Sequence, residues 1–153
     1  MFRKHEMIQS KHMGRPIHLW QYGHFGPPVI AFPSASGMAH EWENNGMIDA
    51  LGDWLEHGKL KLYTVESNVS AVWTRKEEPP HERIKHHLPY ERWVMEELVP
   101  FIRQDCQNDN IPIAVTGTSL GALYAANFAL KYPGIFRYAL CMSGRYDATW
   151  LTN

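Results

Sequence analysis

The spacing of apolar residues along the chain predicts alternating strands and helices. Period-two alternation predicts strands over 5–11 and 16–22, joined near Gly14 as an antiparallel pair. Continuous apolar runs predict buried strands at 29–32, 60–65, 111–116 and 136–142. Apolar residues at helical spacing predict helices over 46–57, 89–102 and 119–132, and the charged segment 74–83 is expected to form a surface loop. Pro100 is expected to kink the second helix or to end its regular part.

The order of these elements predicts the fold class. Strands that alternate with helices require right-handed crossovers and a mostly parallel sheet, so we expect an α/β fold with an antiparallel N-terminal strand pair. The length of 153 residues fits a single domain, 1–153. The last predicted strand ends at Met142, and no helix follows it before Asn153. This ending is abrupt for such an architecture, so we expect the domain to be incomplete.

Composition and charge narrow the function classes. The 15 basic and 16 acidic residues give a formal net charge of −1, which removes the bulk attraction that would predict nucleic acid or an anionic membrane as partner. No apolar run reaches the ~18 residues of a membrane span, and the charged N-terminus lacks the apolar stretch of a secretory signal. We therefore expect a cytoplasmic protein, although export of a form whose signal has been removed stays open. Two cysteines, Cys106 and Cys141, exclude a disulfide scaffold and a four-thiolate zinc site.

One short motif carries chemistry. The segment Gly117-Thr118-Ser119-Leu120-Gly121 matches Gly-x-Ser-x-Gly between a predicted strand and a predicted helix, a setting typical of a nucleophilic serine on a sharp turn. Gly117 and Gly121 leave room for the turn, and Ser119 then projects above the C-terminal edge of the sheet. The Leu120 N–H would face a developing oxyanion near a helix N-terminus. The alternative is a serine that only caps the helix in a glycine-rich turn.

At this point the chain resembles the family named Putative esterase (esterase-D-like), a branch of the α/β-hydrolase fold. The matching stretches lie in 29–37, 46–51, 90–93, 99–102, 113–122, 126–129 and 143–147. The resemblance implies a three-layer sandwich whose C-terminal strands are missing here, and serine hydrolysis of a small-molecule or polymeric carboxylic ester without cofactor or metal. It also implies a second oxyanion donor in the loop after the third strand, where Pro33-Ser34-Ala35 makes the Ala35 N–H the candidate, because Pro33 has no N–H.

The base that such a serine needs is missing. The family order is Ser, then Asp or Glu, then His, yet all nine histidines precede Ser119 and Asp147 is the only acidic residue after it. Three explanations stay open: a truncated or cleaved esterase, a second polypeptide or strand exchange that supplies the rest, or an unusual upstream base, for which His40 is the best candidate. Asp147 could be the acid or an ordinary loop residue. An uncovered last strand would favour a homo-oligomer or a complementing chain.

Two weaker signals complete the sequence picture. His81, His86 and His87 lack metal-ligand spacing, so no metal site is expected. Three tryptophans in predicted loops could line an acyl or aryl pocket or be partly buried: Trp42, Trp73 and Trp150. The other three are expected in the core: Trp20, Trp54 and Trp93. The competing function is a catalytically inactive α/β-hydrolase-like module that binds a ligand or a protein.

Overall fold

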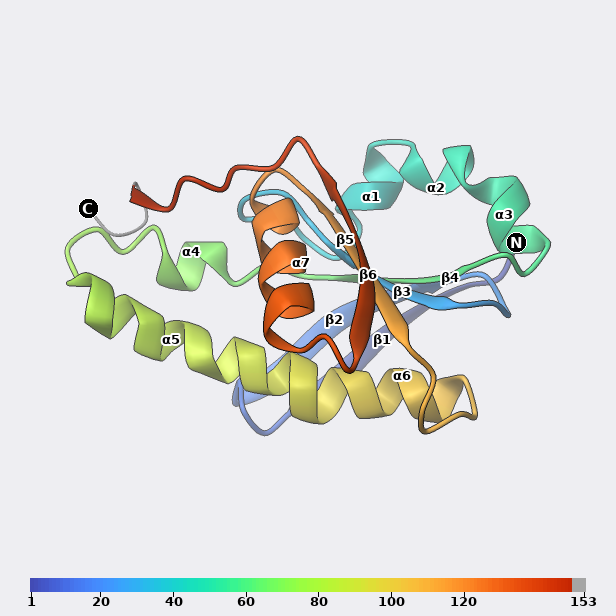
Figure 1. The fold of residues 1–153 in the computed structure, drawn as a ribbon, viewed down its shortest axis with the longest axis horizontal. Helices are drawn as coiled ribbons and strands as arrows, with labels where there is room; N and C mark the ends of the chain where they lie inside the picture. The colour runs from blue at the N-terminus through green and yellow to red at the C-terminus, as the bar shows by residue number, and fades with distance from the viewer. Residues whose placement is uncertain (150–153) are drawn as a thin grey trace.

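The computed structural model describes residues 1–149 and contains one six-stranded sheet (Figure 1). The strand order is β1-β2-β4-β3-β5-β6. The strands are β1 (Arg3–Ser10), β2 (Arg15–Tyr22), β3 (Pro28–Phe32), β4 (Lys61–Val65), β5 (Ile113–Thr118) and β6 (Phe136–Met142). β2 is antiparallel to β1 and β4, and the pairs β3–β4, β3–β5 and β5–β6 are parallel. The α/β class and the antiparallel N-terminal pair are therefore confirmed.

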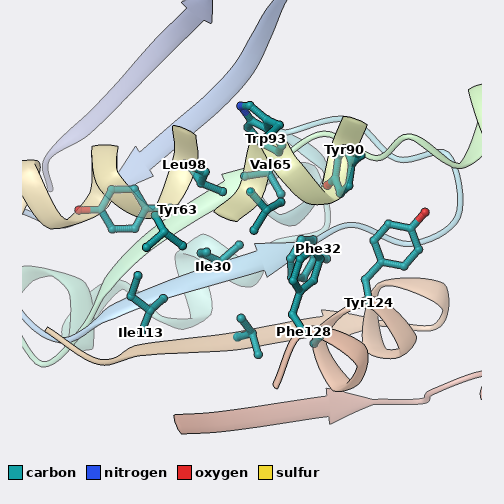
Figure 2. Packing of buried hydrophobic residues seen from close by; sticks show 14 of the residues in the cluster. Ile30, Phe32, Tyr63, Val65, Tyr90, Trp93, Leu98, Ile113, Tyr124 and Phe128 are labelled. Atoms are coloured by element: carbon teal, nitrogen blue, oxygen red, sulfur yellow. The ribbon is translucent and has the colours of Figure 1, made fainter. Parts of the chain in front are cut away.

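Helices cover both faces of the sheet and give three layers. The helical elements are α1 (Glu41–Asn44), α2 (Met47–Ala50), α3 (Gly52–Glu56), α4 (Val69–Val72), α5 (Pro80–Trp93), the π-helical turn Val94–Leu98, α6 (Val99–Asp105) and α7 (Leu120–Lys131). One core cluster joins β2–β5 to α5, α6 and α7, and Figure 2 shows Phe32 within it, stacked on Phe128, with the Tyr124 ring edge-on to Phe32. A smaller cluster packs Trp42 and Ile48 from α1 and α2 on the opposite face.

Two helix predictions were wrong in extent. The helix expected over 46–57 is two short helices, α2 and α3, which are divided at Leu51, where φ is −91° and ψ is 1°. The helix expected to begin at Pro89 begins at Pro80 and replaces part of the predicted loop. The buried face of this helix carries the polar residues Arg83 and His87 beside Tyr90. Because these polar residues are typical of a solvated segment, the sequence pattern predicted a surface loop here.

Pro100 does not end the helical run. It lies in the first turn of α6, where its missing N–H matters least, and the preceding π-helical turn shifts the hydrogen-bonding register. Among the tryptophans, Trp42 and Trp93 are buried and Trp73 is half-buried, whereas Trp54 is 58 % exposed and not in the core as expected. Trp150 lies outside the described residues.

β6 forms an uncovered edge of the sheet. It pairs only with β5 among the described strands, so the backbone groups on its other side face outward. The side chains of Tyr138 and Leu140 are 71 % and 65 % exposed, although this strand has the apolar composition of a buried one. A groove of about 300 Å³ lined almost entirely by apolar residues runs from this strand to α2. Exposed apolar edges of this kind invite pairing with another strand.

Candidate active site

Ser119 lies at the junction of β5 and α7 in a backbone conformation that non-glycine residues rarely adopt. Its φ is 57° and its ψ is −114°, and strain of this kind costs on the order of 1–3 kcal/mol when the surrounding structure enforces it. The side chain makes no hydrogen bond to the helix N-terminus. Ser119 is half-buried, and among residues 1–149 no partner takes its hydroxyl. A capping role therefore does not explain this serine.

Gly117 and Gly121 are where the turn is most crowded. A Cβ atom at position 117 would lie 2.8 Å from the Ala122 nitrogen and closer still to the Gly121 carbonyl group. A Cβ atom at position 121 would lie 2.6 Å from the Phe32 carbonyl oxygen and closer still to that of Pro33. Only glycine fits either position without backbone movement. The same contacts place the first turn of α7 directly against the loop that follows β3.

Neighbouring backbone groups hold the turn in place. The Ser119 N–H donates to the Met142 carbonyl at 3.0 Å, at the end of the adjacent strand β6. The Ser119 carbonyl accepts from the N–H groups of Ala122 at 3.2 Å and Arg145 at 3.3 Å. Leu120 is the first residue of α7, so its N–H has no acceptor within the helix. The turn thus leaves one hydroxyl and one adjacent N–H available.

The loop after β3 is fixed by two side chains. Glu41 accepts from the Ser34 N–H at 2.7 Å and from its hydroxyl at 2.6 Å. Ser67 donates its hydroxyl to the Ala35 carbonyl at 2.6 Å and its N–H to the Gly37 carbonyl at 3.0 Å. Ala35 itself has a φ of 32° and is exposed, and its N–H has no acceptor among the described residues. Pairing of Phe32 with Gly117 across β3 and β5 brings this loop beside Ser119.

The candidate base His40 and the candidate acid Asp147 form no hydrogen-bonded relay with Ser119 among the described residues. His40 is exposed at the start of α1, and its side chain makes no hydrogen bond to a described residue. Asp147 is exposed and accepts from the N–H of Thr149 at 3.0 Å and from its hydroxyl at 2.7 Å. These two hydrogen bonds lower the pKa of Asp147. Its carboxylate thus belongs to a local turn.

Within the part of the chain that the structure describes, no group of three or more His, Cys, Asp or Glu side chains is placed to hold a metal ion. His81 and His86 lie within ion-pair distance of Glu82 and Glu78 on the surface. In residues 1–149 we also find no helix that combines the length and the apolar character needed to span a membrane.

Glu41 and Ser67 were not found from the sequence. Both act on the loop after β3 from other elements, and neither belongs to a motif. A partial signal exists for Ser67, because it lies two residues after the end of β4 and the carboxyl ends of parallel strands meet at one edge of the sheet. The neighbouring Glu66 faces the other way and binds Arg15 at 2.5 Å and the His18 N–H at 3.0 Å.

The strand order, the crossover helices and the serine at a strand-to-helix turn define a protein of the α/β-hydrolase fold. Many solved structures share this arrangement with the chain. A family model described as Putative esterase matches residues 11–152, and the chain belongs to that family.

Three similar structures illustrate the relationship. The fluorophosphonate-binding serine hydrolase F of Staphylococcus aureus is 15 % identical with a TM-score of 0.74, and the match covers 97 % of this chain and 59 % of that one. A ferulic acid esterase is 15 % identical with a TM-score of 0.72, covering 94 % and 58 %. The S-formylglutathione hydrolase of Staphylococcus aureus is 14 % identical with a TM-score of 0.68, covering 98 % and 62 %.

The chain spans only 58 %, 59 % and 62 % of the length of these three proteins. Identities this low establish a shared fold and no more. No curated protein sequence matches the chain.

Proposed function

We propose that the chain carries the nucleophile and the oxyanion donors of a serine carboxylic-ester hydrolase. The main support is Ser119: its backbone has a φ of 57°, and its hydroxyl makes no capping hydrogen bond to the helix that follows. In the proposed reaction Ser119 Oγ attacks the ester carbonyl carbon, the alcohol leaves with a proton, and water hydrolyses the acyl-enzyme to the carboxylic acid. The N–H groups of Leu120 and Ala35 donate to the carbonyl oxygen while it carries negative charge.

The proton of Ser119 needs an acceptor, which we propose comes from polypeptide outside residues 1–149. All nine histidines precede Ser119, and among the described residues neither His40 nor Asp147 makes a hydrogen bond to it. Loss of the catalytic base costs on the order of 10⁶-fold in turnover in a comparable protease, whereas oxyanion stabilisation and binding retain about 10³–10⁴-fold over water. The 153 residues alone are therefore expected to have very low esterase activity.

A fluorophosphonate probe tests the nucleophile. After long incubation with the 153-residue chain, peptide mass spectrometry should find the label at Ser119, at a rate on the order of 10³-fold above that of the exposed Ser36. Ser119→Ala should remove this label, whereas Ser36→Ala, the matched control in the neighbouring loop, should keep it. Equal labelling of both serines would overturn the proposal.

The second candidate function is a binding module that has lost its catalysis, and the absence of any histidine after Ser119 favours it. The same labelling experiment separates the two functions. No label at Ser119 in a folded chain, shown by a cooperative unfolding transition, would support the module over the esterase.

The free edge of β6 is where we propose that the missing polypeptide attaches. Support comes from the outward-facing apolar side chains of Tyr138 and Leu140 and from the greater length of the similar structures. In the absence of that polypeptide, a second copy of the chain is the proposed occupant, because antiparallel pairing of two identical edges is self-complementary.

A further inference from the structure

A cavity of about 240 Å³ lies between α5 and α7, away from the serine turn. Its walls include the aromatic side chains of Trp73, Tyr124 and Phe128, and His87 lines it from α5. None of the residues 33–35 and 117–121 lines it. The cavity therefore does not belong to the site described above.

A directional chain of hydrogen bonds ends at His87. The indole N–H of Trp73 can only donate, and it donates to the Tyr124 hydroxyl oxygen at 2.9 Å. Tyr124 must then donate its own proton onward, to Asn68 Oδ1 at 2.5 Å. Figure 2 shows the Tyr124 hydroxyl directed away from Phe32 and Phe128, in keeping with these polar partners.

This chain fixes which nitrogen of His87 carries the proton. Because Asn68 Oδ1 accepts from Tyr124, its Nδ2 group faces His87 Nδ1, and the two nitrogens are 3.3 Å apart. The amide group can only donate there, so Nδ1 accepts and the neutral ring carries its proton on Nε2. Burial lowers the pKa of His87 to about 4, which keeps the ring neutral at pH 7.

The Nε2–H of His87 is then a donor without a partner. The side chain is only 6 % exposed, and no hydrogen bond to Nε2 exists among the described residues. The two charged groups near it pair with each other, since Lys131 Nζ donates to Glu91 Oε1 at 2.5 Å. Nε2 is not one of the fully buried polar atoms, so a molecule that enters the cavity can present an acceptor atom to it in place of water.

We propose that this cavity binds a small aromatic carbonyl compound, whose ring packs between Trp73 and Phe128 and whose oxygen accepts from His87 Nε2–H. Ring stacking suits the aromatic walls, and a neutral acceptor suits a neutral donor. The proposal does not depend on the esterase activity. Asn68, which donates to His87, adjoins Ser67, the residue that holds the Ala35 loop, so His87 and Asn68 connect the cavity to that loop.

Acetophenone and ethylbenzene make a matched pair of probes, because they differ chiefly in the carbonyl oxygen. Titration of the 153-residue chain, followed by the indole N–H resonance of Trp73 in ¹H–¹⁵N spectra, should saturate with acetophenone at a dissociation constant about tenfold lower than that of ethylbenzene. Long-range ¹H–¹⁵N spectra of the His87 ring should show the Nε2–H form before addition. Equal binding of both probes, no saturable binding, or a proton on Nδ1 would each overturn the proposal.

Three variants locate the site. His87→Phe should remove the preference for acetophenone, whereas His86→Phe, which changes the adjacent exposed ring, should keep it. Leu123→Phe narrows the cavity from α7 without touching the hydrogen-bond chain, so a folded Leu123→Phe protein should bind both probes at least tenfold more weakly. Unchanged binding in this variant would place the probes elsewhere and contradict the proposal.

Discussion

Gly121 on α7 lies against Phe32 at the end of β3, so closely that a Cβ atom at position 121 would be 2.6 Å from the Phe32 carbonyl oxygen. Gly121→Ala must therefore move either the helix or the loop that carries Ala35. Overpacking of this kind destabilises by about 1–3 kcal/mol, which we expect as a decrease in the free energy of unfolding measured in urea. Gly52→Ala is the control, because no atom lies within 4 Å of its Cβ position. A Gly121→Ala protein as stable as the parent would contradict the crowded turn.

The strain at Ser119 predicts that the wild-type residue lowers stability. Glycine adopts a φ of 57° without a Cβ penalty, so Ser119→Gly should recover part of a strain on the order of 1–3 kcal/mol, less about 0.5–1 kcal/mol for the freedom of glycine in the unfolded chain. The expected net gain is about 1 kcal/mol in urea unfolding, with complete loss of fluorophosphonate labelling.

Ser119→Ala is the matched comparison, since alanine keeps the Cβ atom and its strain. Its stability should stay within about 0.5 kcal/mol of the parent, because the hydroxyl makes no hydrogen bond to a described residue. If the glycine variant is no more stable than the alanine variant, the turn is not strained.

The local part of this structure was readable from the sequence, and the non-local part was not. Gly117, Ser119 and Gly121 lie within one short segment, so their spacing alone predicts the turn from strand to helix. The contacts that hold this turn against the end of β3 and against Met142 were not predicted. The uncovered last strand also followed from the order of the elements. Ser67 reaches the Ala35 loop from the segment after β4, and Glu41 reaches it from α1. Such contacts depend on tertiary packing that no spacing rule contains.

The error at α5 has a related cause. Hydrophobic periodicity assumes that the buried face of a helix is apolar, but α5 buries Arg83 and His87. His87 is satisfied on one side by Asn68, a residue from a distant loop. Polar groups that are buried because of partners far along the chain look like surface residues until the fold is known.

His87 also predicts how stability depends on pH. Burial holds its pKa at about 4, below its ordinary value of 6.5, while nearby Glu91 raises it and Lys131 lowers it to smaller extents. The unfolded chain then binds more protons than the folded one between these two values, so the free energy of unfolding falls as the pH falls from 6.5 towards 4. The loss from this one group between pH 7 and pH 4.5 should be about 2 kcal/mol.

Comparison of two variants isolates that contribution from the titration of carboxylates. Urea unfolding at pH 7 and pH 4.5 should show a smaller loss of stability for His87→Phe than for the parent. His86→Phe should behave like the parent, because His86 is exposed. The same pH dependence in all three proteins would show that His87 is not held neutral in the fold.

The edge of β6 predicts self-association of the 153-residue chain. Tyr138 and Leu140 expose apolar surface beside unpaired backbone groups, and Arg137 is the only charged residue on the strand. Sedimentation velocity at micromolar concentration should find a dimer or a larger species. Leu140→Lys should weaken the association at least tenfold, because a charge placed on a free edge opposes strand pairing. Leu88→Lys, which changes an exposed leucine on α5, should leave the association unchanged. A monodisperse monomer of the parent chain would refute pairing at this edge. If Leu140→Lys and Leu88→Lys weakened the association equally, the interface would not lie at β6.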